Sequence, residues 1–143
     1  MDDDPAEGIY RAMVEDKDGL PMLGLSALTL GVRPVVDIVV DAANQVHRPA
    51  FHPDEANGMS CSPTIADLPM FALPVKWGGT NRKTTVWRIE QADLALDLVA
   101  QEDTVSVAMG RHISIGPART MTFDDYLRAV QSTRVKWKKV TKN

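Results

Sequence analysis

The chain has 143 residues, of which 44% are hydrophobic and 24% are charged. These proportions are typical of a globular protein, and a chain of this length can bury enough apolar surface to fold as one domain without a metal or disulfide scaffold. Sixteen Lys and Arg residues against 19 Asp and Glu residues give a formal net charge of -3. This acidic balance argues against a dedicated nucleic-acid-binding protein.

The composition predicts a protein of a reducing compartment. Cys61 is the single cysteine, so no internal disulfide can form, and the cytoplasm is the expected localisation. No apolar run approaches the roughly 18 residues that a membrane span requires, so no membrane partner is expected. Residues 1–5 read Met-Asp-Asp-Asp-Pro, which is acidic where a secretion signal would be basic. If the protein leaves its cell, we therefore expect a secretion machine that needs no cleavable signal peptide to carry it.

Charge is distributed unevenly along the chain. The first 18 residues contain seven carboxylates, whereas residues 134–142 contain five Lys and Arg side chains. We expect residues 1–8 to form an acidic tail and residues 138–143 a basic tail, both flexible, within a single domain that spans residues 1–143. The basic tail is the part of the chain through which an anionic partner such as RNA would bind.

The first part of the chain contains two predicted strands and one predicted short helix. Residues 9–14 are apolar apart from Arg11 and are followed by a turn-rich segment, which is typical of a strand. Residues 23–30 fit a short helix, and Gly31 stands where a helix commonly ends. Residues 35–40 are almost continuously β-branched, which predicts a strand buried on both faces.

Turn and helix-start signals occupy the middle of the chain. Two prolines and two histidines fall within residues 47–53, and the Asn57-Gly58 pair marks a tight turn. Ser62 precedes a proline, an arrangement typical of a helix start, so a short helix is expected up to Asp67.

Two further strands and a helix are predicted toward the C-terminus. Residues 84–89 are strand-like, and residues 111–115 alternate polar and apolar side chains, so that Ile113 and Ile115 share one face and His112 points the other way. A capping box starts at Thr122, and the apolar residues after it recur at helical spacing. The predicted helix is amphipathic, and its apolar residues are Phe123, Leu127, Val130 and Trp137. The whole is a predominantly β domain of the α+β class.

Arg11 is a candidate functional residue because it interrupts an apolar strand. Burying a guanidinium is costly unless it meets an anion or a set of carbonyl groups. An internal ion pair or an edge position facing water would satisfy Arg11. A phosphate-bearing ligand would satisfy it as well, since phosphate oxygens match the planar fork of the guanidinium.

Ser60 and His112 are candidates of a similar kind. Ser60 follows a predicted turn, where the backbone can approach a ligand closely and the hydroxyl can hydrogen-bond a sugar. Turn chemistry and a helix cap also account for the small residues around it. His112 is compatible both with a packed or partly exposed histidine and with a catalyst.

Cysteine and metal chemistry are weaker alternatives. Cys61 could act as a nucleophile with His47, His52 or His112 as its base, but such an arrangement depends on geometry that a sequence does not contain. The same four residues could bind zinc. Their spacing matches no metal-ligand pattern, so no metal is expected.

Several short segments follow one another in the order and spacing of a known family. They are Tyr10-Arg11-Ala12, Gly58-Met59-Ser60, Trp87-Arg88-Ile89 and His112-Ile113-Ser114-Ile115-Gly116-Pro117-Ala118, followed by Met121 and the C-terminal helix. From Tyr10 to about Trp137 the chain resembles the small ADP-ribosyltransferase-like effector toxins that bacterial type VI secretion systems deliver, and related bacterial proteins.

The resemblance implies a compact split β-sheet that binds NAD as its substrate, and a cytotoxic activity in a recipient bacterial cytoplasm. It implies transfer of ADP-ribose to an unidentified macromolecular acceptor, or NAD hydrolysis, and a cognate immunity protein or antitoxin. Arg11 matches the family's strand arginine, which would bind the pyrophosphate or its ribose. Ser60 matches the serine that orients the nicotinamide ribose, and His112 matches a histidine that bonds a ribose hydroxyl or moves a proton. Tyr10 belongs to the same cofactor-binding set.

One position departs from the family's pattern. Related transferases place a glutamate on a late strand to hold the ribose 2′-hydroxyl, and here that stretch is Gly110-Arg111-His112. Glu90 and Glu102 are the nearest acidic candidates. The alternatives to an NAD enzyme are a non-catalytic nucleotide- or partner-binding module of the same fold, and an RNA-binding or RNA-modifying domain that uses the basic tail.

Overall fold

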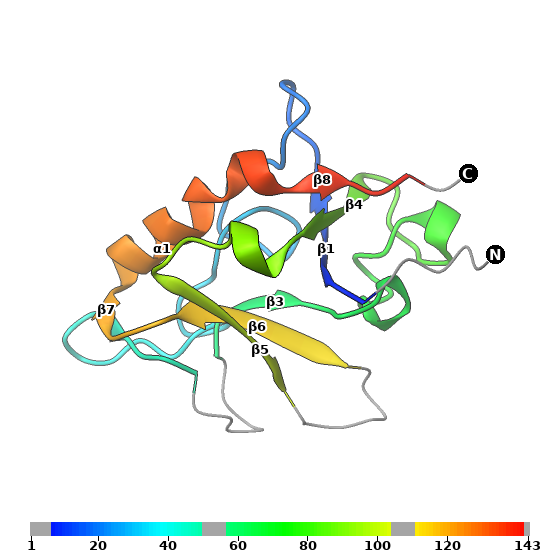
Figure 1. Cartoon of the computed structure of the whole chain (residues 1–143). Helices are drawn as coiled ribbons and strands as arrows, with labels where there is room; N and C mark the ends of the chain where they lie inside the picture. Colours follow the sequence, from blue (N-terminus) through cyan, green and yellow to red (C-terminus); the bar gives the residue numbers. More distant parts are fainter. Residues whose placement is uncertain (1–6, 50–56, 104–110, 142–143) are drawn as a thin grey trace.

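The computed structural model describes residues 7–49, 57–103 and 111–141, which form a mixed α/β architecture (Figure 1). Within these ranges there are three small antiparallel sheets and one α-helix, which lies near the C-terminal end. The sequence-based expectation of an α+β fold with a C-terminal helix is confirmed at this level.

The first sheet contains β1 (Ile9–Val14), β4 (Thr84–Ile89) and β8 (Lys138–Lys139), in the order β1-β4-β8. The strands predicted over residues 9–14 and 84–89 are confirmed. β8 consists of two residues that the sequence analysis assigned to a flexible basic tail. Because these residues pair with β4, any C-terminal tail begins later than expected.

Side chains on β1 alternate between two apolar clusters. Ile9 and Met13 belong to the main core, whereas Tyr10 and Ala12 belong to a second, smaller cluster on the other face of the strand. Successive side chains of a strand point to opposite faces, so Arg11 projects on the same side as the main core.

A second three-stranded sheet contains β3 (Met59–Cys61), β5 (Leu98–Asp103) and β6 (His112–Pro117), with β6 in the centre. Ile113 and Ile115 are both buried in the main core, as the predicted alternation of this strand requires. His112 and Ser114 therefore lie on the opposite face of the sheet.

The two larger sheets are joined by hydrogen bonds between the segments around β1 and β3. Tyr10 and Ser62 exchange backbone hydrogen bonds, with N···O distances of 2.8 and 2.9 Å. One position further along, the backbone pairing gives way to the side chain of Arg11, which reaches across to the carbonyl oxygen of Ser60. The gap between β1 and β3 is thus closed by a guanidinium group rather than by a strand ladder.

Helix α1 (Phe123–Ser132) lies above the β3-β6-β5 sheet in Figure 1. Its first turn is capped by Thr122, whose hydroxyl accepts a hydrogen bond from the backbone N–H of Asp125, as the capping box predicted. The hydroxyl of Tyr126 donates to the carbonyl of Ile115 and accepts from the backbone N–H of Met59 at 3.1 Å. These bonds fix the helix to both β3 and β6.

The remaining elements are short. β2 (Gln45–Val46) and β7 (Met121–Thr122) pair with each other. β7 comes directly before α1 in the sequence. Trp137 is buried in the main core, but it follows the end of α1 and is not part of the helix as predicted. Short 3-10 helices span Ile65–Asp67, Val75–Trp77, Gln91–Asp93 and Arg134–Lys136.

The prediction of a helix over residues 23–30 is wrong. This segment forms turns, and Leu23 and Leu30 make an isolated bridge. The carbonyl groups of Ser26 and Thr29 accept hydrogen bonds from Arg11. The turns therefore leave backbone carbonyl groups free to accept hydrogen bonds from a buried cation. In a regular helix most of these carbonyl groups would bond the helix's own N–H groups.

The buried strand predicted over residues 35–40 is also wrong. The segment is a turn in which Val35 is 76% exposed and has a positive φ of 71°. Arg33 and Asp37 close this turn through a side-chain ion pair at 3.0 Å. The intrinsic strand preference of valine is overridden by this polar closure.

The short helix expected after Ser62 begins later than predicted. The 3-10 helix Ile65–Asp67 is capped by the side chain of Thr64, which accepts a hydrogen bond from the N–H of Asp67. Ser62 is instead buried, and its backbone forms the bridge to β1.

The oppositely charged ends of the chain meet in the fold. Arg134 forms ion pairs with Asp16 and Asp18 at 3.3 and 2.7 Å, and Lys139 pairs with Glu15 at 3.0 Å. Two of the basic side chains near the C-terminus, Arg134 and Lys139, are thereby paired within the chain.

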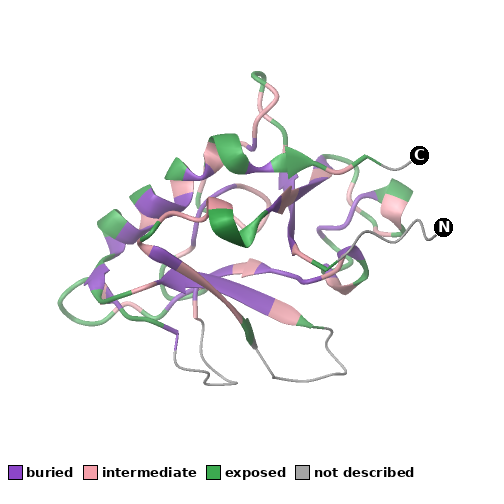
Figure 2. Ribbon diagram, in the orientation of Figure 1, coloured by how far each residue is buried: buried purple, intermediate pink, exposed green. Residues whose placement is uncertain are grey.

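Buried residues follow the core-facing sides of β6 and α1 in Figure 2, and exposed residues lie on the outer side of α1. Within the described ranges, no helix combines the length and the apolar character needed to cross a membrane.

Candidate functional site

Arg11 is 4% exposed and its guanidinium is held by backbone carbonyl groups. Nη1 donates to Ser60 O at 2.6 Å, Nε donates to Thr29 O at 3.2 Å, and Nη2 donates to Thr29 O at 2.8 Å and to Ser26 O at 3.1 Å. These bonds use four of the five guanidinium hydrogens. Of the partners that the sequence analysis considered, a set of carbonyls satisfies Arg11.

The positive charge of Arg11 has no carboxylate in direct contact among the described residues. Burial lowers the pKa of Arg11, and the neighbouring Cys61 and Asp37 counteract this effect. An arginine remains protonated in proteins, so a cation is present here in a region of low polarity. Such a cation generates a positive potential that favours an anionic ligand.

Ser60 and His112 form a hydrogen bond between Oγ and Nε2 at 2.6 Å. Both side chains come from adjacent strands, since Ser60 on β3 lies opposite Ser114 on β6 and His112 is two residues before Ser114. The two residues are partly exposed, so the pair is accessible. A serine hydroxyl bonded to an imidazole can hydrogen-bond a sugar hydroxyl or transfer a proton.

The three candidates Arg11, Ser60 and His112 are therefore connected. Arg11 binds the backbone of Ser60, and the side chain of Ser60 binds His112. Tyr10 is not part of this group, because its side chain is fully buried in the second cluster and its hydroxyl accepts a hydrogen bond from Arg88 at 2.9 Å.

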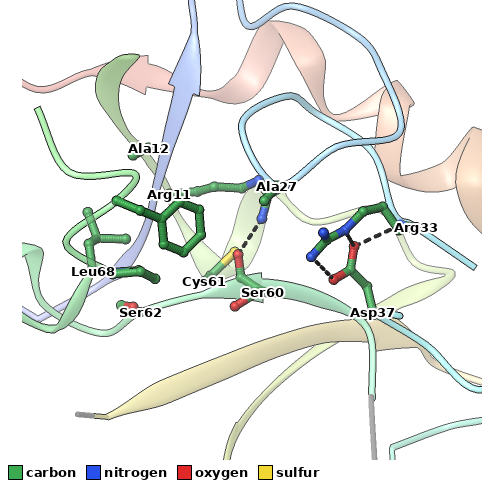
Figure 3. Close-up of a pocket in the computed structure, with 11 residues that line it drawn as sticks. Arg11, Ala12, Ala27, Arg33, Asp37, Ser60, Cys61, Ser62 and Leu68 are labelled. Carbon is green, nitrogen blue, oxygen red and sulfur yellow. Dashed lines mark hydrogen bonds and ion pairs between the residues drawn. The ribbon is translucent and has the colours of Figure 1, made fainter. Parts of the chain in front are cut away.

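A pocket of about 250 Å³ opens beside Arg11 and Ser60 (Figure 3). Its polar lining comes from Arg11, Arg33, Asp37, Ser60 and Ser62. The other lining residues are apolar or weakly polar: Ala12, Ala27, Cys61, Leu68, Pro69 and Phe71. Two guanidinium groups against one carboxylate give this lining a net charge of +1. Pockets for drug-sized ligands span about 300–1,000 Å³, so this pocket is slightly smaller than that range.

Arg33 and Asp37 form the charged rim of the pocket. Asp37 accepts hydrogen bonds from Nε and Nη2 of Arg33, at 3.1 and 3.0 Å, and from the backbone N–H of Arg33 at 2.8 Å. The Arg33 side chain is 40% exposed, compared with 10% for Asp37. The pair thus anchors the carboxylate and presents the guanidinium to solvent.

Neither candidate glutamate lies in this pocket. Glu90 forms an ion pair with Arg88 at 3.1 Å, and Glu102 forms one with Arg111 at 2.6 Å. Arg111 also binds Glu7 at 2.9 Å, so Glu102 belongs to a surface charge network.

Cys61 does not have the properties of a nucleophile. It is 1% exposed, and burial raises the pKa of its thiol to about 12. His47 lies elsewhere, bonded to Thr120 Oγ1 and Asp41 Oδ2, and His52 lies outside the described residues. In the part of the chain that the structure describes, no three metal-ligating side chains cluster.

The sequence analysis missed Arg33 and Asp37. It assigned Asp37 to a buried strand, although Arg33 and Asp37 are four residues apart and flank Pro34, which is a signal for a side-chain-closed turn. Gln101 lies opposite Ser114 on β5 and does not line the pocket, and its Oε1 is buried with no hydrogen-bond partner within the described ranges.

Comparisons with protein-family models, with curated proteins and with solved structures find no match to this chain.

Proposed function

We propose that this protein binds NAD and breaks the bond between nicotinamide and ribose, either by hydrolysis or by transfer of ADP-ribose to an acceptor. The connection of Arg11, Ser60 and His112 supports the proposal most strongly, because these residues are far apart in the sequence and the family resemblance assigns all three to one NAD site. A positively charged pocket that Arg11 and Ser60 line, but His112 does not, adds support, since NAD carries an anionic pyrophosphate.

The proposed reaction balances with water as the only co-reactant. The bond between ribose C1′ and the nicotinamide nitrogen breaks, and its electron pair leaves with nicotinamide, which becomes neutral. Water attacks C1′ and loses one proton, giving ADP-ribose. The transition state has oxocarbenium character, as in glycoside hydrolysis, so the site has to orient the ribose and allow positive charge to develop on it.

The three residues have different roles in this proposal. Ser60 and His112 bind the nicotinamide ribose, and His112 accepts the proton of the attacking nucleophile. Arg11 is a positioning residue, because its hydrogen bonds to Ser60, Ser26 and Thr29 fix the serine relative to the pocket.

In the cell, we propose that the activity is cytotoxic in a recipient bacterial cytoplasm and that an immunity protein blocks it. Expression of the native chain in an unprotected bacterium should arrest growth and lower cellular NAD. Ser60→Ala and His112→Ala should allow growth, whereas His47→Ala, which changes a histidine outside the site, should arrest growth like the native chain. Normal growth with abundant, folded native protein would exclude the toxin.

The second candidate is a non-catalytic nucleotide-binding module. The ion pairs of Glu90 and Glu102 favour it, because neither glutamate lines the pocket and Asp37 is paired with Arg33. A binding module would show a higher melting temperature with ADP-ribose and no release of nicotinamide from NAD.

A further inference from the structure

Arg11 is poorly suited to bind a pyrophosphate directly. Four of its five guanidinium hydrogens already bind carbonyl groups, and the residue is 4% exposed. A ligand that took these donors would leave the partly buried carbonyl groups of Ser26, Thr29 and Ser60 without them, which opposes binding.

Arg33 offers what Arg11 lacks. Its Nε and Nη2 donate to Asp37, and no hydrogen bond from Nη1 is present among the described residues. In Figure 3 the guanidinium groups of Arg11 and Arg33 lie on the same side of β3, and both residues line the pocket. An anion between them would interact favourably with both, and it would offset the repulsion of two nearby like charges.

We propose that Arg33, oriented by Asp37, is the residue that binds the phosphate groups of the ligand. Arg11 adds positive potential to the pocket without donating hydrogen bonds to the ligand. The identity of the ligand as an ADP-ribose-containing dinucleotide rests on the proposed function, whereas the phosphate site rests on the pocket alone.

The backbone of the Arg33–Asp37 turn supports this assignment. Val35 has a φ of 71°, a conformation that is rare and strained for a β-branched residue. The turn is held in this state by the ion pair and by the hydrogen bond from the N–H of Asp37 to the carbonyl of Arg33. Strain of this kind persists where the surrounding contacts require one side-chain position.

The opposite end of the ligand has a different environment. Phe71 lines the pocket while being 59% exposed, and Leu68 and Pro69 extend this apolar part of the lining. A planar ring can pack there while the phosphates reach Arg33. The two ends of the pocket can therefore be tested separately.

Titration calorimetry at fixed ionic strength, with inorganic pyrophosphate and with ADP-ribose as probes, tests the proposal. Arg33→Gln should weaken the binding of both probes by about tenfold or more, because a charge-assisted hydrogen bond is lost. The control Arg119→Gln removes an exposed arginine that is paired with Asp97 outside the pocket, and it should change neither affinity more than about twofold. Phe71→Ala should weaken ADP-ribose only.

Asp37→Asn separates binding from a purely structural role. It raises the net charge of the lining by one unit, so pyrophosphate should bind as tightly as before or more tightly, even if the melting temperature falls. Arg33→Lys should retain part of the affinity, because it keeps the charge and loses the planar fork. If Arg33→Lys binds pyrophosphate no more tightly than Arg33→Gln does, the charge at this position does not bind the anion and the proposal is overturned.

The outcomes for the phosphate site and for the NAD reaction are distinguishable. If the native chain fails to bind pyrophosphate, or if Arg33→Gln binds it as well as Arg119→Gln does, the phosphate site is refuted. If pyrophosphate binding depends on Arg33 but NAD is neither bound nor cleaved, the phosphate site stands and the proposed function fails. If NAD is cleaved with the same KM by native and Arg33→Gln protein, the function stands and the phosphate site is refuted.

Discussion

Ser60 Oγ lies 2.6 Å from Nε2 of His112, although the two residues are 52 positions apart in the sequence. The antiparallel register explains the contact: Ser60 is opposite Ser114, and His112 is the next residue on the same face of β6. The carbonyl of the same serine accepts a hydrogen bond from Arg11. Ser60 is therefore the residue that joins a buried cation to a partly exposed histidine.

Replacing Arg11 should destabilise the fold even where the charge is kept. Arg11→Lys retains the charge but cannot reproduce the forked geometry, so at least one of its partly buried carbonyl acceptors loses its donor. We expect the free energy of unfolding to fall by about 1–3 kcal/mol in urea denaturation. The control Arg128→Lys, at a side chain that is 77% exposed, should change it by less than about 0.5 kcal/mol. Equal effects of the two substitutions would contradict the buried role of Arg11.

Gly58 is required at the start of β3. Its φ is 146°, and a Cβ at this position would lie 2.3 Å from the carbonyl oxygen of Ile115. Gly58→Ala should lower the free energy of unfolding by about 3 kcal/mol or more, because both the backbone conformation and the β3–β6 contact are disturbed. Gly78 also has a positive φ, of 97°, but a Cβ there meets no atom within 4 Å. Gly78→Ala should therefore cost only about 1–2 kcal/mol, and a similar loss for both variants would refute the steric explanation.

Cys61 should be chemically inert in the folded protein. Burial raises the pKa of its thiol to about 12, so almost no thiolate is present at pH 8. Mass spectrometry after treatment with iodoacetamide should detect no modification until denaturant is added. Cys61→Ala should retain the proposed activity, and rapid alkylation of the native chain would restore the cysteine nucleophile as a candidate.

The contact between the two ends of the chain should weaken in acid. Hydrogen bonds from Arg134 hold the pKa of Asp18 below its ordinary value of 3.8. The unfolded state then binds a proton more readily than the folded state, so the contribution of this pair is present above pH 3.8 and is lost as the pH falls through the lower folded-state pKa. Thermal melts of native protein and of Asp18→Asn should differ near neutral pH and converge in strong acid. A constant difference across this range would show that the ion pair does not contribute.

The sequence predicted the elements whose patterns are local. Residues 9–14 and 84–89 form strands because their apolar and β-branched side chains pack well in a buried sheet. Thr122 caps the helix through its own hydroxyl. The alternation around Ile113 also identified which face of β6 carries His112.

The errors come from side chains that act over longer distances. The turn at residues 33–37 is formed by an arginine–aspartate pair that overrides the strand preference of the valines. Residues 23–30 are not helical, and two of their carbonyl groups bind Arg11 from another part of the fold. Sequence patterns indicated that Arg11 needs partners, but only the tertiary structure identifies them as carbonyl groups.

Release of nicotinamide from NAD by the purified chain is the most direct measurement of the proposed activity. The native protein should produce nicotinamide and ADP-ribose in equal amounts by chromatography when water is the acceptor. Ser60→Ala and His112→Ala should be slower by about 100-fold or more, the usual effect of losing an acid–base group, while His47→Ala should retain the native rate. Absence of nicotinamide release by the folded native chain, or unchanged rates in the Ser60 and His112 variants, would contradict the account.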